Sequence, residues 1–190
     1  MGDDPSGPVS GGEFAPGRLP GYGPIGVIDI GSNSVRLVLY ERLSRALTPL
    51  FNEKVLAGLG RGLSENGRLA DESVDTALTA IRRFHQLADQ TGATQLDVIA
   101  TAAVRDAENG AAFIEAVAEI CGSDPQVLSG QDEAKVSALG VASSFFKPDG
   151  VVGDLGGGSL ELIDIKGDEL GVGETFPLGG LRLSETAKGS

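Results

Sequence analysis

The sequence predicts an α/β fold in which one strand–turn–strand unit is written twice. Apolar periodicity gives the element order βββαβαβα over the first part of the chain, and strands then begin again near residue 151. The stretch DIGSNSVRL at residues 29–37 returns as DLGGGSLEL at residues 154–162. A hydrophobic content of 41% over 190 residues is sufficient for one well-packed domain and the start of another.

The first elements are three strands and a long helix. Short runs rich in branched apolar residues predict strands at Ile25–Ile30, Ser34–Glu41 and Leu47–Leu56, separated by turn residues. Apolar residues then recur at helical spacing over Asp71–Thr91, and Gly92 provides a stop.

The rest of the first unit alternates strands with helices. Strands are predicted at Leu96–Thr101 and Val127–Ser129, on either side of a helix over Asn109–Gly122 that Asn109 can cap. The S-x-x-D pattern at residues 129–132 opens a third helix that ends at about Phe146.

The second unit is predicted to be incomplete. Strands at Val151–Leu155, Ser159–Ile165 and Leu170–Phe176 are followed by no helix pattern. We therefore divide the chain into a flexible Gly/Pro-rich tail (1–23), a first domain (24–147) and the truncated start of a second domain (148–190). Without covering helices, one face of the second unit is expected to expose apolar side chains, namely Val151, Leu155, Leu160, Leu162, Ile163 and Leu181.

Charge and cysteine content exclude several classes of protein. A formal charge of −12 argues against general affinity for nucleic acid or anionic membranes, so a phosphorylated ligand would need local cations or a metal. The single cysteine, Cys121, forms no disulfide within the chain, which indicates a reducing compartment.

No apolar run approaches the ~20 residues that span a bilayer, and no signal-peptide pattern begins the chain. A cytoplasmic location is expected.

The two glycine turns have the chemistry of a phosphate and metal site. In both, a strand ends in an aspartate, Asp29 or Asp154, and enters a loop whose backbone N–H groups can bind an anion. Two carboxylates at strand ends can hold a divalent cation. One such turn alone is better explained as a tight hairpin that needs glycine, but two matched copies favour ligand binding.

The copies differ in charge at one position. Arg36 in the first copy supplies a cationic fork suited to phosphate oxygens, whereas Glu161 in the second supplies an acid suited to metal or water. The two sides of one cleft would then differ chemically. Either side chain could instead be a solvated strand residue.

Four motifs, in order, resemble one known family. IDIGSNSVRLVLYE (28–41), ATAAVRDAEN (100–109), LSGQDEA (128–134) and DLGGGSLEL (154–162) are similar to the exopolyphosphatase / guanosine pentaphosphate phosphohydrolase family, a branch of the actin, Hsp70 and sugar-kinase superfamily. PLGGLRL (177–183) resembles the segment that closes the first hairpin sheet of that family's second domain. The resemblance implies a ribonuclease-H-like domain, the first strands of a second such domain, and Mg²⁺ in the cleft between them.

The resemblance also implies roles for individual residues. Glu133 would be the carboxylate that activates water, with Asp154 as a second catalytic acid. The alternative for Glu133 is that an acid in the first turn only stabilises the helix through its dipole, by ~0.3–1 kcal/mol. Asp132 stands where many relatives have a second glutamate. The implied phosphate-binding residues are Asn33, Ser34, Arg36, Arg105, Gly156, Gly157, Gly158 and Ser159, and the implied metal ligands are Asp29, Asp154 and Glu161.

The resulting hypothesis is an exopolyphosphatase that hydrolyses terminal phosphates of polyphosphate. The alternatives are pppGpp 5′-phosphohydrolase activity, with guanosine penta- or tetraphosphate as ligand, and a phosphate or alarmone sensor without catalysis. A kinase of the same superfamily is disfavoured because the motifs around Arg105 and Glu133 resemble the phosphatase branch. We expect this chain alone to be an incomplete, weakly active fragment, and the full-length protein to form a homodimer.

Overall fold

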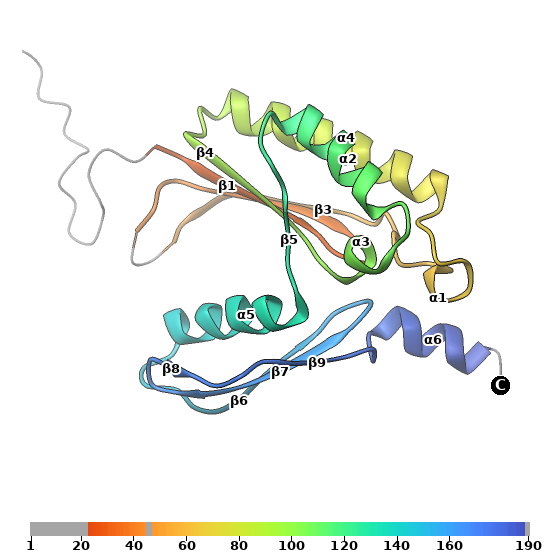
Figure 1. The fold of residues 1–190 in the computed structure, drawn as a ribbon. Helices are drawn as coiled ribbons and strands as arrows, with labels where there is room; N and C mark the ends of the chain where they lie inside the picture. The colour runs from red at the N-terminus through yellow and green to blue at the C-terminus, as the bar shows by residue number, and fades with distance from the viewer. Residues whose placement is uncertain (1–22, 45–46, 189–190) are drawn as a thin grey trace, which may run out of the picture.

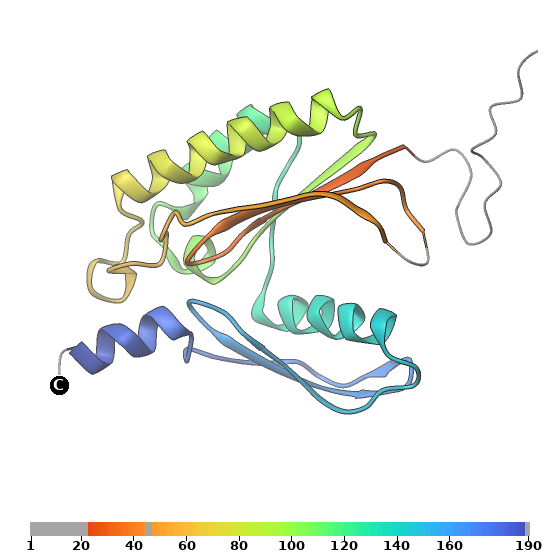
Figure 2. The same cartoon turned by 180° about the vertical axis from the view of Figure 1, so that it is seen from behind.

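The described residues form two separate β-sheets, each with its own helices. The computed structural model describes residues 23–44 and 47–188, so the predicted tail lies outside the described residues apart from Gly23. Figures 1 and 2 show the N-terminal sheet covered by its helices, the second sheet on the other side of α5, and the last helix, α6, at one end of the molecule. No helix within the described residues is long and apolar enough to cross a membrane.

The first sheet has five strands in the order β3-β2-β1-β4-β5. Its strands are β1 (Ile25–Ile30), β2 (Val35–Tyr40), β3 (Pro49–Val55), β4 (Gln95–Ala100) and β5 (Gln126–Val127). The hairpin neighbours β1–β2 and β2–β3 pair antiparallel, while β4 pairs parallel with both β1 and β5. This arrangement confirms the predicted order of elements.

Helices α2 (Asp71–Gln90) and α4 (Gly110–Cys121) cover one face of this sheet (Figure 2). Every second residue of β2 is buried beneath them, and Phe84 of α2 is fully buried in the same core. The opposite face of β1 and β2 carries Asp29 and Arg36. The hydrophobic alternation of the strands thus leaves polar residues on the face that looks toward the second sheet.

The structure contains two short helices that the sequence does not predict, and the predicted helix cap at Asn109 is wrong. Helix α1 (Leu63–Asn66) and helix α3 (Ala102–Asp106) are each a single turn or little more. Asn109 precedes α4 but makes no side-chain cap; its side chain accepts from the backbone N–H of Leu69 at 2.9 Å and donates to the Leu69 carbonyl at 3.1 Å. Asn109 fastens a loop to the helix instead, because both polar atoms of its amide are satisfied there.

The second sheet consists of β6 (Asp149–Leu155), β7 (Leu160–Lys166), β8 (Glu169–Leu170) and β9 (Glu174–Phe176). Strands β6, β8 and β9 all pair antiparallel with β7. The single strand predicted at Leu170–Phe176 is wrong, because the chain leaves the sheet between Leu170 and Glu174. Gly173 in that gap lies so close to α5 that an added Cβ would come within 2.7 Å of Ala134.

Helix α5 (Gly130–Ser144) packs on the second sheet, on the side that faces the first (Figure 1). Two predictions therefore need correction: the third helix does not complete the first unit, and the second sheet does have a covering helix. Ala134 and Ala138 are the buried residues of α5 that contact Val152 and Ile163. Small side chains at this spacing let the helix lie directly on the strands.

The predicted exposure of the second sheet holds for only some residues. Val151 is 66% exposed and Leu155 is 64% exposed, whereas Ile163 is 2% exposed because it faces α5. Leu160, Leu162 and Leu181 are partly buried. The alternation of β7 explains the split, since residues 161, 163 and 165 point to α5 and their neighbours point away.

Helix α6 (Gly180–Lys188) was not predicted. Its first N–H groups donate to the second glycine turn, from Gly180 to the Gly156 carbonyl and from Leu181 to the Gly157 carbonyl, both at 2.9 Å. A Cβ at Gly179 would lie 2.3 Å from the backbone of that turn, so only glycine permits this approach. The tertiary contact with the turn fixes where the helix begins.

Candidate active site

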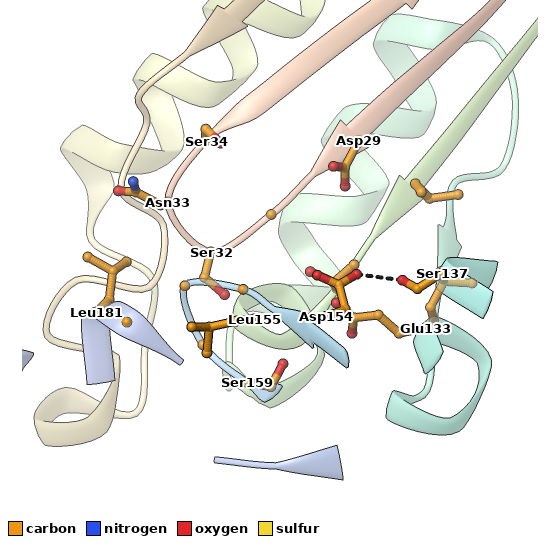
Figure 3. A pocket seen from close by; sticks show the side chains of 18 of the residues that line it. Asp29, Ser32, Asn33, Ser34, Glu133, Ser137, Asp154, Leu155, Ser159 and Leu181 are labelled. Atoms are coloured by element: carbon orange, nitrogen blue, oxygen red, sulfur yellow. Dashed lines mark hydrogen bonds between the residues drawn. The ribbon is translucent and has the colours of Figure 1, made fainter. Parts of the chain in front are cut away.

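A cavity of about 590 Å³ opens between the two glycine turns. Figure 3 shows its walls, with the first turn and β1 on one side and the second turn and α5 on the other. The predicted site residues that line it are Asp29, Asn33, Ser34, Glu133, Asp154, Gly156, Gly157, Gly158 and Ser159. Residues more than 120 positions apart in the sequence thus meet at one cavity.

The two turns have the same backbone geometry. Gly31 donates its N–H to the Ser34 carbonyl at 2.9 Å, and Gly156 donates to the Ser159 carbonyl at 2.9 Å. Each bond closes a hairpin directly after a strand whose second-to-last residue is an aspartate, Asp29 in β1 and Asp154 in β6. The repeat in sequence is therefore a repeat in structure.

Glycine in the second turn allows the two turns to touch. A Cβ added to Gly158 would lie 2.6 Å from Ser32 Oγ, and one added to Gly157 would lie 3.2 Å from Ser32 Cβ. The second copy has glycines where the first has Ser32 and Asn33. Side chains from one turn occupy the space that the other turn leaves empty.

Two acids on the cavity wall, Glu133 and Asp29, have raised pKa values. Burial, followed by repulsion from Glu161, raises the pKa of Glu133 from 4.5 to about 7, although Arg105 opposes this shift. Burial and the nearby Asp154 raise the pKa of Asp29, against the attraction of Arg36 and Lys54. A carboxylate with a pKa near 7 can accept a proton at neutral pH.

Glu161 lies behind the wall of the cavity. It is 1% exposed, and its Oε1 accepts a hydrogen bond from the Thr175 hydroxyl at 2.8 Å. Its Oε2 is buried without a hydrogen-bond partner. A buried carboxylate oxygen with no donor is costly, which fits a group that a cation or a bound water would complete.

The two predicted phosphate-binding arginines do not line the cavity. Arg36 is exposed on the sheet face, where its Nε donates to Asn52 Oδ1 at 2.9 Å. Arg105 is half-buried, and its Nη1 donates to the Leu128 carbonyl at 3.0 Å and lies 3.5 Å from Glu133 Oε2. In this structure Arg105 contacts the predicted catalytic acid.

Lys54 and Ser137 are among the cavity residues that the sequence reasoning missed. Lys54 of β3 and Ser137 of α5 both line the cavity. Lys54 lies opposite Arg36 in the strand register, so pairing of the third strand with the second could have indicated it. Ser137 follows Glu133 by four residues, which on a helix places the two on the same face.

The acid set fits a magnesium ion that substrate helps to hold. Within residues 23–44 and 47–188, no three His, Cys, Asp or Glu side chains gather into a preformed metal cage. Mg²⁺, however, commonly binds through one or two carboxylates, its own waters and substrate phosphates. Asp29 and Asp154 supply that number of carboxylates, and Asp154 is close enough to raise the pKa of Asp29.

Helix α6 ties the second sheet to the first at the end of the cavity. Glu185 accepts hydrogen bonds from the Gly62 N–H at 2.8 Å and the Ser64 hydroxyl at 2.6 Å. Arg182 forms an ion pair with Asp106 at 3.6 Å. These contacts hold the two glycine turns face to face.

Known proteins are similar to this chain in sequence and in fold. The Ppx/GppA phosphatase family matches residues 38–188. The chain belongs to the Ppx/GppA phosphatase family. Exopolyphosphatase 1 of Mycobacterium tuberculosis (strain ATCC 25618 / H37Rv) is 31% identical over 163 residues, which cover 84% of this chain and 47% of that protein. The chain thus spans about half the length of the curated relatives it matches.

Solved structures agree with that assignment. An exopolyphosphatase from Cytophaga hutchinsonii superposes with a TM-score of 0.79 at 30% identity, covering 86% of this chain and 53% of that one. The Aquifex aeolicus member of the Ppx/GppA family gives 0.75 at 31% identity, covering 86% of this chain and 54% of that one. The ethanolamine utilization protein EutJ from Carboxydothermus hydrogenoformans, at 18% identity and a TM-score of 0.54, shares the fold alone. The predicted ribonuclease-H-like, actin-like fold class is confirmed.

Proposed function

We propose that this chain carries the catalytic cleft of an exopolyphosphatase, a phosphoanhydride hydrolase that releases terminal phosphate from inorganic polyphosphate. The observation that carries the proposal is the position of Glu133. It lies on the wall of a cavity between two glycine turns, with a pKa raised to about 7. Membership of the Ppx/GppA family and the names of its relatives support the same reaction.

Each part of the cavity has a task in this reaction. Backbone N–H groups and the serine hydroxyls of the two turns would bind the terminal phosphate, because successive amides in a turn form an anion-binding nest. Glu133 would accept the proton of the attacking water. Arg105, beside Glu133, would favour its ionised form before that transfer.

We propose Mg²⁺ as the cofactor, held by Asp29 and Asp154 with Glu161 behind them. When bound, the ion would neutralise charge that develops on the phosphate oxygens. The three carboxylates would repel a polyanion without it. Lys54, which lines the cavity, and Arg36 next to it would add positive charge on the side of the first turn.

A phosphate-release assay on the complete gene product tests the proposal. We expect orthophosphate release from polyphosphate that requires Mg²⁺ and is lost on chelation. The same assay with pppGpp separates the closest alternative, because both substrates end in a phosphoanhydride. Faster release from pppGpp would assign the site to guanosine pentaphosphate, and binding of either ligand without turnover would assign a sensor.

A further inference from the structure

Ser137 lines the cavity and has no role in the reaction described above, although its hydroxyl contacts a proposed metal ligand, Asp154. It lies on α5 one helical turn after Glu133, and both side chains line the cavity. Its hydroxyl donates a hydrogen bond to Oδ2 of Asp154, which Figure 3 marks with a dashed line. One face of one helix therefore carries the proposed base and a donor to the acid of the second turn.

The position of the Ser137 hydroxyl is set by the core of the second sheet. Ala134 and Ala138 on α5 are buried against Val152 and Ile163 of that sheet. Asp154 lies two residues after Val152, on the same face of β6. Ser137 and Asp154 thus belong to one packed unit, and their hydrogen bond does not depend on how the two sheets approach each other.

The neighbouring acid is held in the same way. Asp154 and Glu161 lie directly opposite each other in the register of β6 and β7. Thr175 donates its hydroxyl to one oxygen of Glu161, as Ser137 does to one oxygen of Asp154. A hydroxyl that engages one carboxylate oxygen fixes the rotation of the group and directs the other oxygen to its remaining neighbours.

We propose that Ser137 is a positioning residue, which holds Oδ2 of Asp154 so that Oδ1 is presented to a divalent cation in the cavity. The inference rests on the proposed function, in which Asp154 binds that cation. A purely structural role would be to fasten α5 to β6. The two roles differ in what they change, since only the first alters cation binding and turnover in a protein that is fully folded.

Two variants of equal shape separate these roles. Ser137→Thr retains the hydroxyl, whereas Ser137→Val replaces it with a methyl group of the same size. Ser143→Ala serves as the control, because Ser143 lies on the same helix and donates to the Gly140 carbonyl away from the cavity. Circular dichroism and urea unfolding establish that each variant is folded, and Ser137→Ala provides a smaller substitution if the valine disturbs packing.

Cation binding is the first measurement. Mn²⁺ titration of the 190-residue chain in the presence of orthophosphate, which supplies the phosphate oxygens that substrate would, is followed by electron paramagnetic resonance. It should show about 10–100-fold weaker binding in Ser137→Val, the usual effect of removing a partner that orients a metal ligand. Ser137→Thr should restore the affinity, and Ser143→Ala should match the wild type. Equal affinity in the wild type, Ser137→Val and Ser137→Ala, or no Mn²⁺ binding by the wild type, would overturn the proposal.

Turnover of polyphosphate by the complete gene product is the second measurement. In Ser137→Val, kcat should fall about 10–100-fold at saturating Mg²⁺ while KM changes less than threefold, because the phosphate-binding turns are untouched. A rise in KM with unchanged kcat would contradict the positioning role. If the wild type releases no phosphate from polyphosphate, the proposed function fails, and the Mn²⁺ titration still decides the role of Ser137.

Discussion

The two glycine turns are alike in backbone and opposite in charge. Each is closed by the same glycine-to-serine hydrogen bond, and in each the strand-end aspartate faces the residue that differs, Asp29 facing Arg36 and Asp154 facing Glu161. Arg36 is exposed, whereas Glu161 is 1% exposed. One hairpin geometry therefore serves two chemical environments.

The difference in burial comes from what lies over each hairpin. Helix α5 and Thr175 of β9 cover the second hairpin on the side of Glu161. On the corresponding face of the first hairpin, Asp29 and Lys54 line the cavity and Arg36 beside them is exposed, so an arginine can stay hydrated there. In the proposed function both turns bind phosphate and each contributes one aspartate to the metal, so we infer that the hairpins differ in what they add: the first adds the cation Arg36, and the second adds the buried acid Glu161.

The largest expected effect tests the side of the second turn. Glu133→Gln should lower kcat for polyphosphate by ~10²–10⁴-fold, because a lost general base typically costs that much. Binding of polyphosphate should remain nearly unchanged, since the glutamine keeps the shape of the side chain. A kcat within about twofold of the wild type would remove Glu133 from the mechanism.

A smaller effect on binding tests the side of the first turn. If Arg36 leaves Asn52 to bind phosphate, Arg36→Ala should weaken polyphosphate binding by ~1.5–3 kcal/mol, the scale of a charge-assisted hydrogen bond, which a raised KM in steady-state assays would show. Arg36→Lys should also be impaired, because an ammonium group does not reproduce the guanidinium fork. Arg105→Ala tests whether the same holds for an arginine that contacts Glu133.

An unchanged KM in both Arg36→Ala and Arg105→Ala would contradict a role of these arginines in phosphate binding. Arg82→Ala is a suitable control, since Arg82 is an exposed residue of α2 and is not among those that line the cavity. A loss of kcat without a change in KM in Arg105→Ala would mean that this arginine acts through Glu133, which its 3.5 Å contact favours.

The contact between the turns predicts an effect on stability. Gly158→Ala would place a Cβ 2.6 Å from Ser32 Oγ and 3.1 Å from Ala102 Cβ. Overpacking of this kind typically costs ~1–3 kcal/mol of unfolding free energy, measurable by urea unfolding of the 190-residue chain. Gly140→Ala is the matched control, because nothing lies within 4 Å of its Cβ and alanine favours a helix over glycine by about 1 kcal/mol. Equal stability of the two variants would mean that the turns do not touch in solution.

The last expected effect is a pH dependence of stability that belongs to Glu133. Its pKa in the folded protein is raised from 4.5 to about 7, so the folded state binds the proton more tightly than the unfolded state. The stability from this proton is present below about pH 4.5 and is lost as the pH rises to about 7. The difference in unfolding free energy between wild type and Glu133→Gln should decline across that window, and a flat difference would contradict the raised pKa.

Local patterns predict most of the elements correctly. The long helix at residues 71–91 and the strands of both hairpins depend on periodicity and turn residues that act over a few positions. The Ser129 cap is a local device as well, and its side chain does accept from the Asp132 N–H at 3.2 Å. Helix α6 was missed because its start is fixed by contact with a turn more than twenty residues earlier.

The repeated turn, the alternation of strands and helices, and the acids near the strand ends could all be predicted from the sequence, since each follows from neighbouring residues. Three features could be found only in the folded molecule: α5 covers the second sheet, Glu161 is buried while Arg36 is exposed, and Ser137 donates a hydrogen bond to Asp154. These features depend on which surfaces pack together across the chain. Burial and hydrogen bonding between distant segments are set by that packing, and a local pattern contains no record of it.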